Sequence, residues 1–233
     1  NIIHLALYRF YEPWLSQDLK PDEMNLQTAQ IPSLVEEVFS NSYSSKSMKA
    51  GKLVIAINMV KKTLLQFVLA DIERIKKIGN VRLLALEERI ERSVNMETAN
   101  DSTTIVIHGI IDRIEAHEDD ILVLDYKSGN VLASELSMKD LHDLNEVGKK
   151  PKAIQLLIYA WLVQQQYAGN IKAGIFTLKS QDIKLMMASL HKHDQLLDEM
   201  DSVQNFVVQI IDKMRSLTSF HHNPDSHYCT FCQ

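Results

Sequence analysis

Two aspartates and a lysine stand at the ends of two successive apolar runs, where they could share one site. Asp112 ends the run at residues 104–111, and Asp125 and Lys127 end the run that starts at Ile121. Side chains two positions apart on a strand point to the same face of a sheet, so Asp125 and Lys127 project together. The short acidic turn between the runs would fold them into antiparallel strands, and that pairing can bring Asp112 beside Asp125.

An acid pair beside an ammonium group is suited to metal-dependent hydrolysis of a phosphodiester. Two carboxylates that converge repel each other unless a cation lies between them, and Mg²⁺ or Mn²⁺ prefers such oxygen-rich sites. The ion would polarise the phosphate and lower the pKa of a bound water, while Lys127 would orient that water or stabilise the developing charge. For each residue taken alone a simpler interpretation stays open, because a strand-end Asp is often a turn or solvent group with a nearby Lys as its surface partner.

The elements that would position these residues follow from the spacing of apolar side chains. Repeats of three and four positions predict helices at residues 2–16, about 32–42, 50–79, 152–167 and about 200–217. Glycine–asparagine pairs would end two of these helices, at residues 79–80 and 169–170. Shorter apolar runs predict a meander of three strands and two later strands, at residues 82–94, 104–114, 121–127, 173–178 and about 184–190.

Three motifs occur in order along the chain. Residues 109–115 read Gly-Ile-Ile-Asp-Arg-Ile-Glu, residues 125–129 read Asp-Tyr-Lys-Ser-Gly, and residues 155–159 read Gln-Leu-Leu-Ile-Tyr. In this they resemble the PD-(D/E)XK nuclease superfamily, and within it the RecB/AddB-like branch, whose motifs are G-x-x-D-R-x-D, D-Y-K-x-G and Q-L-x-x-Y. The resemblance spans residues 1 to about 178. Its one departure is Glu115, where Asp is common.

The resemblance implies an α/β domain with a restriction-endonuclease-like core, a small mixed β-sheet flanked by helices. It also implies roles for four residues. Asp112 and Asp125 would bind the metal ion, Lys127 would be catalytic, and His4 on an upstream helix would complete the coordination. The apolar residues around His4 match the family's helix, but the sequence begins too late to show the glycine that usually lies a few residues ahead of this histidine. A helical His can also be merely packed or solvated.

Other residues near these motifs have two interpretations each. Gln155 and Tyr159 share one helical face and would brace Lys127 or contact the DNA backbone, or else only pack the helix. Glu87 would be a further acidic member of the site, or, with Glu88, a solvated strand edge.

The net charge of −5 excludes a protein that coats nucleic acid simply by being basic, so a DNA-binding surface must be local. A group of lysines just before the Gln155 helix could contact phosphates, or be ordinary solvated surface: Lys149, Lys150 and Lys152.

Cys229 and Cys232 are the two cysteines of the chain, too few for an extracellular disulfide framework. Their spacing suggests half of a metal site. In AddB-like nucleases one upstream and three C-terminal cysteines hold an iron–sulfur cluster, so the resemblance implies a 4Fe-4S cluster in a full-length parent protein. The alternatives are a zinc site that includes one of three histidines, or two reduced thiols without a ligand; the histidines are His221, His222 and His227.

We expect residues 1–233 to form a single nuclease domain, a C-terminal fragment of a longer helicase-nuclease-like chain, because the chain begins with Asn and stops one residue after Cys232. The sequence has no run of about 18 apolar residues and no secretory signal, which predicts a cytoplasmic protein without a membrane partner. DNA and the helicase portion or partner subunit of the parent protein are the expected partners.

The predicted function is Mg²⁺- or Mn²⁺-dependent hydrolysis of DNA by an exonuclease that acts in DNA end processing and recombinational repair. One rival is a catalytically inactive DNA-binding or scaffolding module of a repair complex. The other is an unrelated metal-binding interaction domain organised by the two cysteines.

Overall fold

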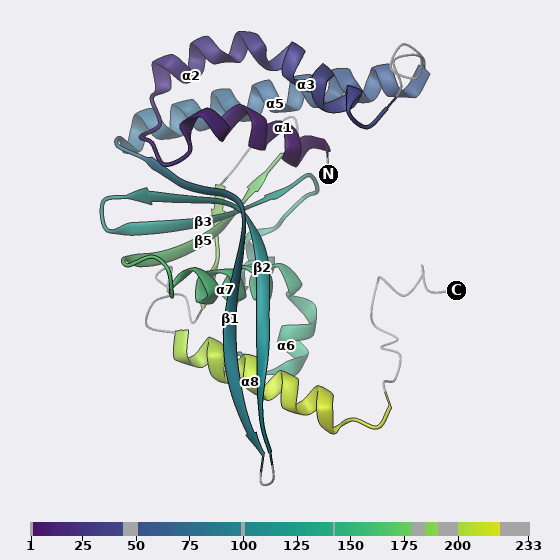
Figure 1. The fold of residues 1–233 in the computed structure, drawn as a ribbon, viewed down its shortest axis with the longest axis vertical. Coiled ribbons are helices and arrows are strands. Elements are labelled where there is room, and N and C mark those ends of the chain that lie inside the picture. Colours follow the sequence, from purple (N-terminus) through teal and green to yellow (C-terminus); the bar gives the residue numbers. More distant parts are fainter. Residues whose placement is uncertain are drawn as a thin grey trace.

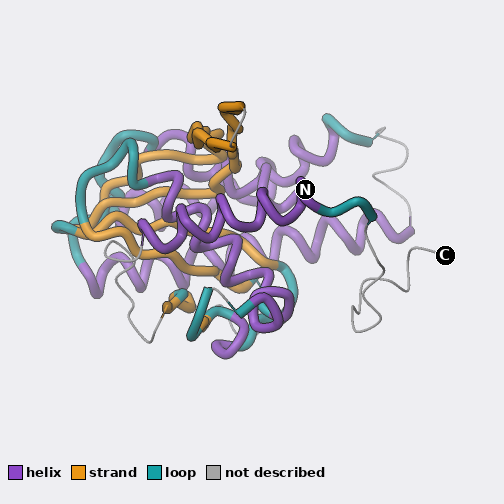
Figure 2. The backbone as a smooth tube through the Cα atoms, turned by 90° about the horizontal axis from the view of Figure 1, so that it is seen from below, coloured by secondary structure: helices purple, strands orange, loops and turns teal. Residues whose placement is uncertain are grey.

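Helices cover both faces of a mixed β-sheet, and the α/β fold class expected from the sequence is confirmed (Figure 1). The computed structural model describes residues 2–43, 51–98, 101–141, 143–178, 185–190 and 200–219. Seen from below, the helices of one layer pass across the strands (Figure 2). Each layer buries its own apolar cluster against the sheet.

The sheet has five strands in the order β1-β2-β3-β5-β6, with bounds β1 (Arg82–Thr98), β2 (Asp101–His117), β3 (Asp120–Lys127), β5 (Asn170–Thr177) and β6 (Leu185–Met187). β1, β2 and β3 form the predicted antiparallel meander, while β5 joins β3 in parallel. A parallel pair needs a crossover connection, and the helix between β3 and β5 supplies it. A second sheet pairs β4 (Ser137–Met138) with β7 (Ser189–Leu190).

β2 is shared between two partners over different lengths. It pairs with β1 from Asp101 to Ala116, apart from Asp112, but with β3 only from Arg113 to His117. The rest of β1 and β2 therefore continues as a two-stranded arm beyond the other strands (Figure 1). Asp112 lies at the fork where β2 leaves β3.

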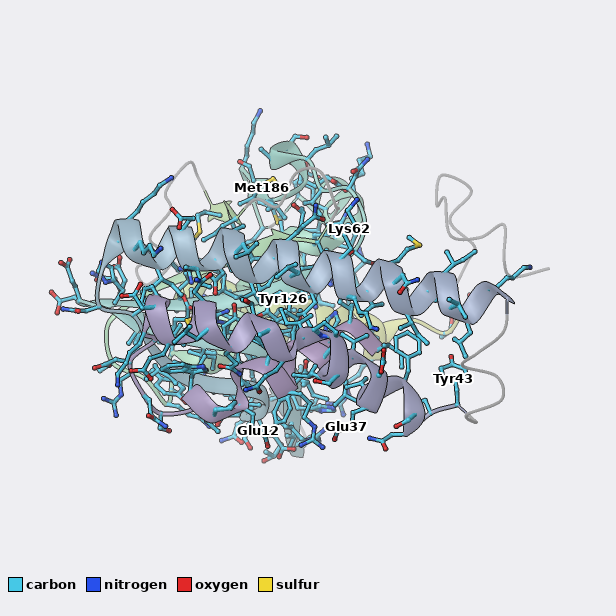
Figure 3. All side chains as sticks on the ribbon, turned by 90° about the horizontal axis from the view of Figure 1, so that it is seen from above. Glu12, Glu37, Tyr43, Lys62, Tyr126 and Met186 are labelled. Carbon is cyan, nitrogen blue, oxygen red and sulfur yellow. The ribbon has the colours of Figure 1, made fainter. Side chains whose placement is uncertain are left out.

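One helical layer consists of α1 (Ile2–Tyr11), α2 (Pro21–Gln27), α3 (Ile31–Ser40) and α5 (Gly51–Ile78). Figure 3, seen from above, has α5 lying across the molecule beside the shorter helices. Among the described residues, α5 is the one helix long and apolar enough to cross a membrane by length and composition, a test that a core helix of a soluble protein also passes. Part of α5 contributes to the cluster beneath this layer.

The opposite layer consists of α6 (Leu144–Lys149), α7 (Pro151–Val163) and α8 (Met200–Ser216). Short 3-10 turns complete the described elements: η1 (Glu12–Trp14), η2 (Thr28–Gln30) and η3 (Ala133–Glu135).

The sequence predicted most of these elements but misplaced some ends. The first helix stops at Tyr11 rather than continuing to residue 16, because Pro13 cannot donate an amide hydrogen and the chain tightens into η1. Pro21 begins α2, a helix that the apolar spacing did not predict, and a proline is tolerated there because the first amide has no helical partner.

The later differences lie at turns. β1 and β2 extend beyond the predicted strand ends at residues 94 and 104 and stay paired as far as Thr98 and Asp101. Gly169 is not the cap of α7, which ends at Val163; its φ of 142° instead lets the chain approach the Asp119 carbonyl as it enters β5. Gly79, with φ of 77°, does end α5 as predicted.

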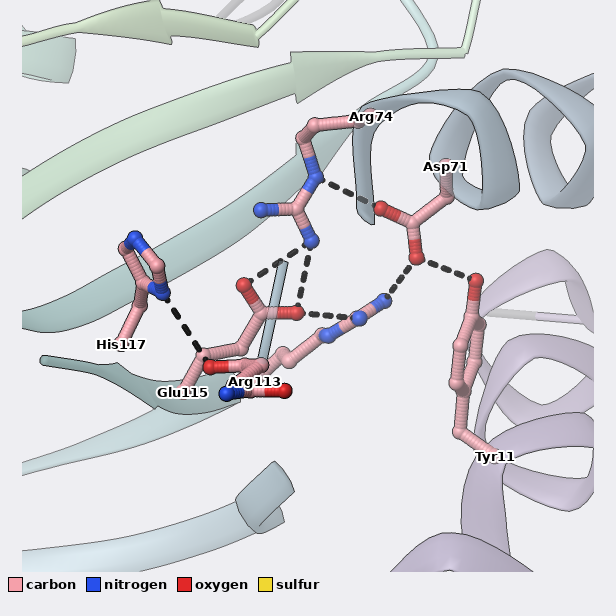
Figure 4. Close-up of polar contacts among 7 residues, drawn as sticks. Tyr11, Asp71, Arg74, Arg113, Glu115 and His117 are labelled. Carbon is pink, nitrogen blue, oxygen red and sulfur yellow. Dashed lines mark hydrogen bonds and ion pairs between the residues drawn. The ribbon is translucent and has the colours of Figure 1, made fainter. Parts of the chain in front are cut away.

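A buried ionic network joins α1, α5 and β2 (Figure 4). Asp71 of α5 accepts hydrogen bonds from Tyr11 (2.7 Å) and Arg74 (2.7 Å) and lies 2.9 Å from Arg113. Glu115 accepts two hydrogen bonds from Arg74, at 2.8 and 2.9 Å, and forms an ion pair with Arg113. The guanidinium of Arg113 also lies over the Tyr11 ring, 4.2 Å from its centre. Two cations thus compensate two anions.

This network fixes the first helix against the sheet. Tyr11 ends α1, and Arg113 directly follows Asp112 on β2. Asp71, Arg113 and Glu115 are all at most 1% exposed, so their charges can remain inside the fold only while they remain paired. The network therefore sets where α1 lies relative to the strand that carries Asp112.

Asp71→Ala should lower the free energy of unfolding by about 3–5 kcal/mol, the cost of leaving a buried charge without its partner. Urea denaturation measures it. The matched control is Glu73→Ala on the exposed side of α5, where Glu73 pairs with Lys76 at the surface and its loss should cost about 0–1 kcal/mol. Equal losses in the two variants would contradict a stabilising role for the network.

The contribution of Asp71 should disappear in acid. Burial raises the pKa of Asp71, but the charges of Arg113 and Arg74 outweigh it and hold that pKa below its ordinary value of 3.8. Unfolding then takes up a proton, so the stabilisation is complete above 3.8 and is lost as the pH falls below it. Below this pH the difference in free energy of unfolding between wild type and Asp71→Ala should become smaller, as measured by urea denaturation at decreasing pH. A difference that stays constant with pH would contradict the prediction.

Candidate functional site

Three carboxylates occupy neighbouring positions on three adjacent strands. The register pairs the residues on either side of Glu87 with those on either side of Asp112, so these two acids face each other across β1 and β2. Arg113 pairs with Leu124, and one step further along the same register Asp112 faces Asp125. The row of acids lies at the fork between β2 and β3, where the two strands separate and side chains can reach one another.

Glu87 has a strained backbone. Its φ is 47°, which is rare for a residue with a side chain and unusual within a strand. The regular pairing of β1 with β2 skips this residue. Such strain persists where the surrounding structure imposes it, and it is concentrated at functional sites. The outlier therefore marks Glu87 as more than a solvated edge residue.

His4 reaches the carboxylate row from α1. Its Nδ1 lies 3.3 Å from an oxygen of Asp112 and 3.7 Å from an oxygen of Glu87. The hydrogen bond with Asp112 raises the pKa of His4 against the opposing effect of burial, and the charges of Asp112, Glu87 and Asp125 add to the rise. His4, Glu87 and Asp112 each offer one ligand atom, and these atoms all lie within 4.8 Å of one another.

Asp112 is held by the neighbouring strand. One of its oxygens accepts a hydrogen bond of 2.7 Å from the backbone amide of Tyr126, and its other oxygen is the one near His4. The Tyr126 ring in turn contacts the His4 ring edge to face, with centres 5.9 Å apart. Asp112 therefore has one oxygen fixed by β3 and one directed at the shared space.

Asp125 and Lys127 lie on one face of β3, as their spacing predicted. Lys127 donates a hydrogen bond of 3.1 Å to Asp125 Oδ1, and its ammonium lies 2.9 Å from Oδ2. Burial raises the pKa of Asp125 and the Asp112 carboxylate adds to that rise, while Lys127 opposes both. Oδ2 is buried, and the Lys127 ammonium is its ion-pair partner.

Gln155 and Tyr159 of α7 support this pair. Gln155 accepts a hydrogen bond from Lys127 (3.1 Å) and donates to both Asp125 (3.0 Å) and the Tyr159 hydroxyl (3.0 Å). Gly109 leaves room for the Tyr159 ring, because the Cβ of any other residue at position 109 would lie 2.7 Å from the ring. Of the three roles weighed for Gln155 and Tyr159, bracing the lysine fits these contacts.

The donor set suits a divalent cation. His4, Glu87 and Asp112 converge, and Asp125 with Lys127 lies beside them. Burial, and then the charge of Asp112, raises the pKa of both Glu87 and Asp125. Oxygen-rich sites of this kind hold Mg²⁺ or Mn²⁺, and nitrogen from one His is compatible with the latter. Such an ion would remove the repulsion among the acids.

The lysines expected to bind phosphate are partly engaged within the protein. Lys152 forms an ion pair with Glu135, and Lys150 donates a hydrogen bond to the Ser137 carbonyl. Lys149 is exposed.

The sequence did not identify the network that supports the site. Glu115 seemed only a departure from a motif, yet it is buried against Arg113 and Arg74. The cysteine tail and its histidines (Cys229, Cys232, His221, His222 and His227) lie outside the described residues.

Comparisons with known proteins agree with the motifs. A family model described as "PD-(D/E)XK nuclease superfamily" matches residues 1–233. A search of curated proteins gives no significant match.

Two solved structures are similar over most of the chain. The crystal structure of SSO0001 is 15% identical, with coverage of 93% of this chain and 88% of that one and a TM-score of 0.33. A candidate exonuclease from Eubacterium rectale is 13% identical, with coverage of 96% and 77% and a TM-score of 0.36. Similarity at these TM-scores supports no argument about fold or activity.

Glu87→Gln should weaken Mn²⁺ binding, because it removes one anionic donor while keeping the side chain's size. We expect at least the about 10- to 100-fold loss typical of changing a residue that merely supports a metal ligand. Isothermal titration calorimetry measures it. Glu88→Gln is the matched control, since Glu88 accepts a hydrogen bond from Tyr167 instead. Wild-type affinity in Glu87→Gln would exclude Glu87 from the site.

Proposed function

The chain belongs to the PD-(D/E)XK nuclease superfamily, and on this basis we propose that it hydrolyses phosphodiester bonds in DNA with Mg²⁺ or Mn²⁺ as its cofactor. The observation that carries the proposal is the convergence of His4, Glu87 and Asp112 beside the Asp125–Lys127 pair. Membership of the family supports the class of reaction, and the geometry supports the roles proposed for the residues.

In the proposed site His4, Glu87, Asp112 and Asp125 would hold the cation. When bound, the ion would polarise the phosphate and lower the pKa of a water. Hydrolysis forms a bond from a water oxygen to phosphorus and breaks the bond from phosphorus to the departing sugar oxygen, and the proton that the water loses passes to solvent or to that oxygen.

Lys127 has the role of stabilising the transition state. Its ammonium lies at the rim of the site with its side chain about one third exposed, so a phosphate oxygen can approach it from outside. Fixed positive charge at the place where negative charge develops is worth more than the same charge in water. Gln155 holds the ammonium beside Asp125 and so reduces the rearrangement needed during reaction.

The finer parts of the proposal rest on the sequence motifs. We infer a RecB/AddB-like exonuclease that processes DNA ends in recombinational repair, as the single nuclease domain of a longer cytoplasmic helicase-nuclease, with no membrane partner. A helicase portion or subunit would be its partner, and Cys229 and Cys232 would supply part of a 4Fe-4S cluster there. Lys149 is the most open of the candidate phosphate contacts.

Linear DNA should be degraded by the wild-type chain in the presence of Mg²⁺, and not detectably by Asp125→Ala. Lys127→Ala should reduce kcat by about 100- to 1,000-fold, the usual effect of removing one group that stabilises transition-state charge. Release of labelled nucleotides measures both. Lys172→Ala is the control, because Lys172 pairs with Asp120 near the far end of β3.

The same experiment separates the proposal from its rival, an inactive DNA-binding or scaffolding module. Full activity in both Asp125→Ala and Lys127→Ala would place the chemistry elsewhere. Binding of DNA without binding of Mg²⁺ or Mn²⁺ by the folded chain, measured by calorimetry, would favour the rival.

A further inference from the structure

A pocket of about 320 Å³ opens beside the carboxylate row, lined by His4, Leu5, Tyr8 and Glu87. Two of these residues, His4 and Glu87, also belong to the cluster that could hold the cation. The other two, Leu5 and Tyr8, belong to α1 and have no part in the proposed hydrolysis. A group that enters this pocket is therefore directly adjacent to a phosphate in the site.

The charges of the pocket do not favour a second phosphate as its occupant. Among the residues that the structure describes, no lysine or arginine lines it, and Glu87 contributes a carboxylate. A phosphate there would be repelled, whereas an uncharged group would not. The remaining wall is apolar, since Leu5 is 39% exposed and is one of the large apolar side chains left open to solvent.

Tyr8 supplies an aromatic wall that is fixed in place. It lies one helical turn after His4, so both side chains emerge on the same face of α1. The ring is half-buried and packs against the cluster beneath α1 and α5, while its hydroxyl lies 3.4 Å from Glu12. A ring held in this way can receive a flat partner with little further loss of side-chain freedom.

We propose that this pocket is a nucleobase subsite, in which the unpaired base next to the scissile phosphate stacks on Tyr8. This inference rests on the proposed nuclease function and adds the form of its substrate. A nucleobase is flat, uncharged and joined through its sugar to the phosphate, as the position of the pocket requires. Stacking tolerates every base, so the preference is for single-stranded DNA without selection of sequence.

The size of the pocket agrees with one unpaired base. Ligand pockets range over about 300–1,000 Å³, and this one lies at the lower limit. The space lies between α1 and the strained segment of β1, and its volume suits one base better than a base pair, which presents twice the flat area. A duplex end would have to open by at least one pair before cleavage.

The subsite is tested by changing the enzyme and the substrate separately and then together. Wild type and Tyr8→Ala are each assayed, in Mg²⁺, on a single-stranded oligonucleotide and on oligonucleotides that lack one base on either side of the cleaved phosphate. Tyr8→Ala should raise KM about tenfold on the intact strand, within the range of about 1–3 kcal/mol for stacking one base. On one of the abasic strands wild type and Tyr8→Ala should have the same KM.

Two controls separate stacking from a general disturbance of the site. Tyr8→Phe keeps the ring and should recover most of the affinity lost in Tyr8→Ala. Tyr43→Ala removes an exposed tyrosine that stacks on Phe39 at the end of α3, and it should leave KM unchanged.

Three results would contradict these proposals. An equal KM increase for Tyr8→Ala on intact and on both abasic strands would overturn the subsite, because a displaced His4 affects all substrates alike. An unchanged KM in Tyr8→Ala with an active wild type would overturn it also and leave the proposed function standing. Wild type that cleaves no DNA with any divalent cation would overturn the proposed function, and the subsite with it.

Discussion

The buried ionic network between α1, α5 and β2 is the interaction on which the rest of this structure depends. Arg113 cannot remain inside the protein without Asp71 and Glu115, and both acids need Arg74 as well. Satisfying these four charges requires α5 to lie across β2 and requires Tyr11 to end α1 beside Asp71. His4, seven positions before Tyr11 on the same helix, is then brought over Asp112.

The buried network and the carboxylate row differ in how far their charges are compensated, although Arg113 and Asp112 are neighbours on β2. Arg113 points into the layer beneath α1 and α5, where its charge is fully compensated by protein groups. Asp112 lies at the fork of the sheet, where Glu87 and Asp125 add like charges and Lys127 compensates only in part. Complete compensation of the buried charges in the network stabilises the fold. Incomplete compensation of the carboxylates leaves the site with affinity for a cation.

The strained backbone and the hydrogen bonds that hold the site lie in the same part of the sheet. Glu87 adopts a left-handed backbone within β1, and the sheet loses β3 as a partner of β2 at Asp112. These irregularities open the site, while contacts from outside the strands hold its members: Tyr126 amide to Asp112, and Gln155 to the Asp125–Lys127 pair.

The sequence by itself determined the local facts: the strand pattern that puts Asp125 and Lys127 on one face, the acidic turn that aligns Asp112 with Asp125, and the α/β class. These depend on spacing and on short turns, which residues near in sequence fix. Only the tertiary structure decided that Glu87 joins the site, that Glu115 belongs to the buried network and that Tyr8 borders a pocket. Their partners lie far away in sequence, and a left-handed residue inside a strand or a charge buried by a distant helix leaves no periodic signal in the chain.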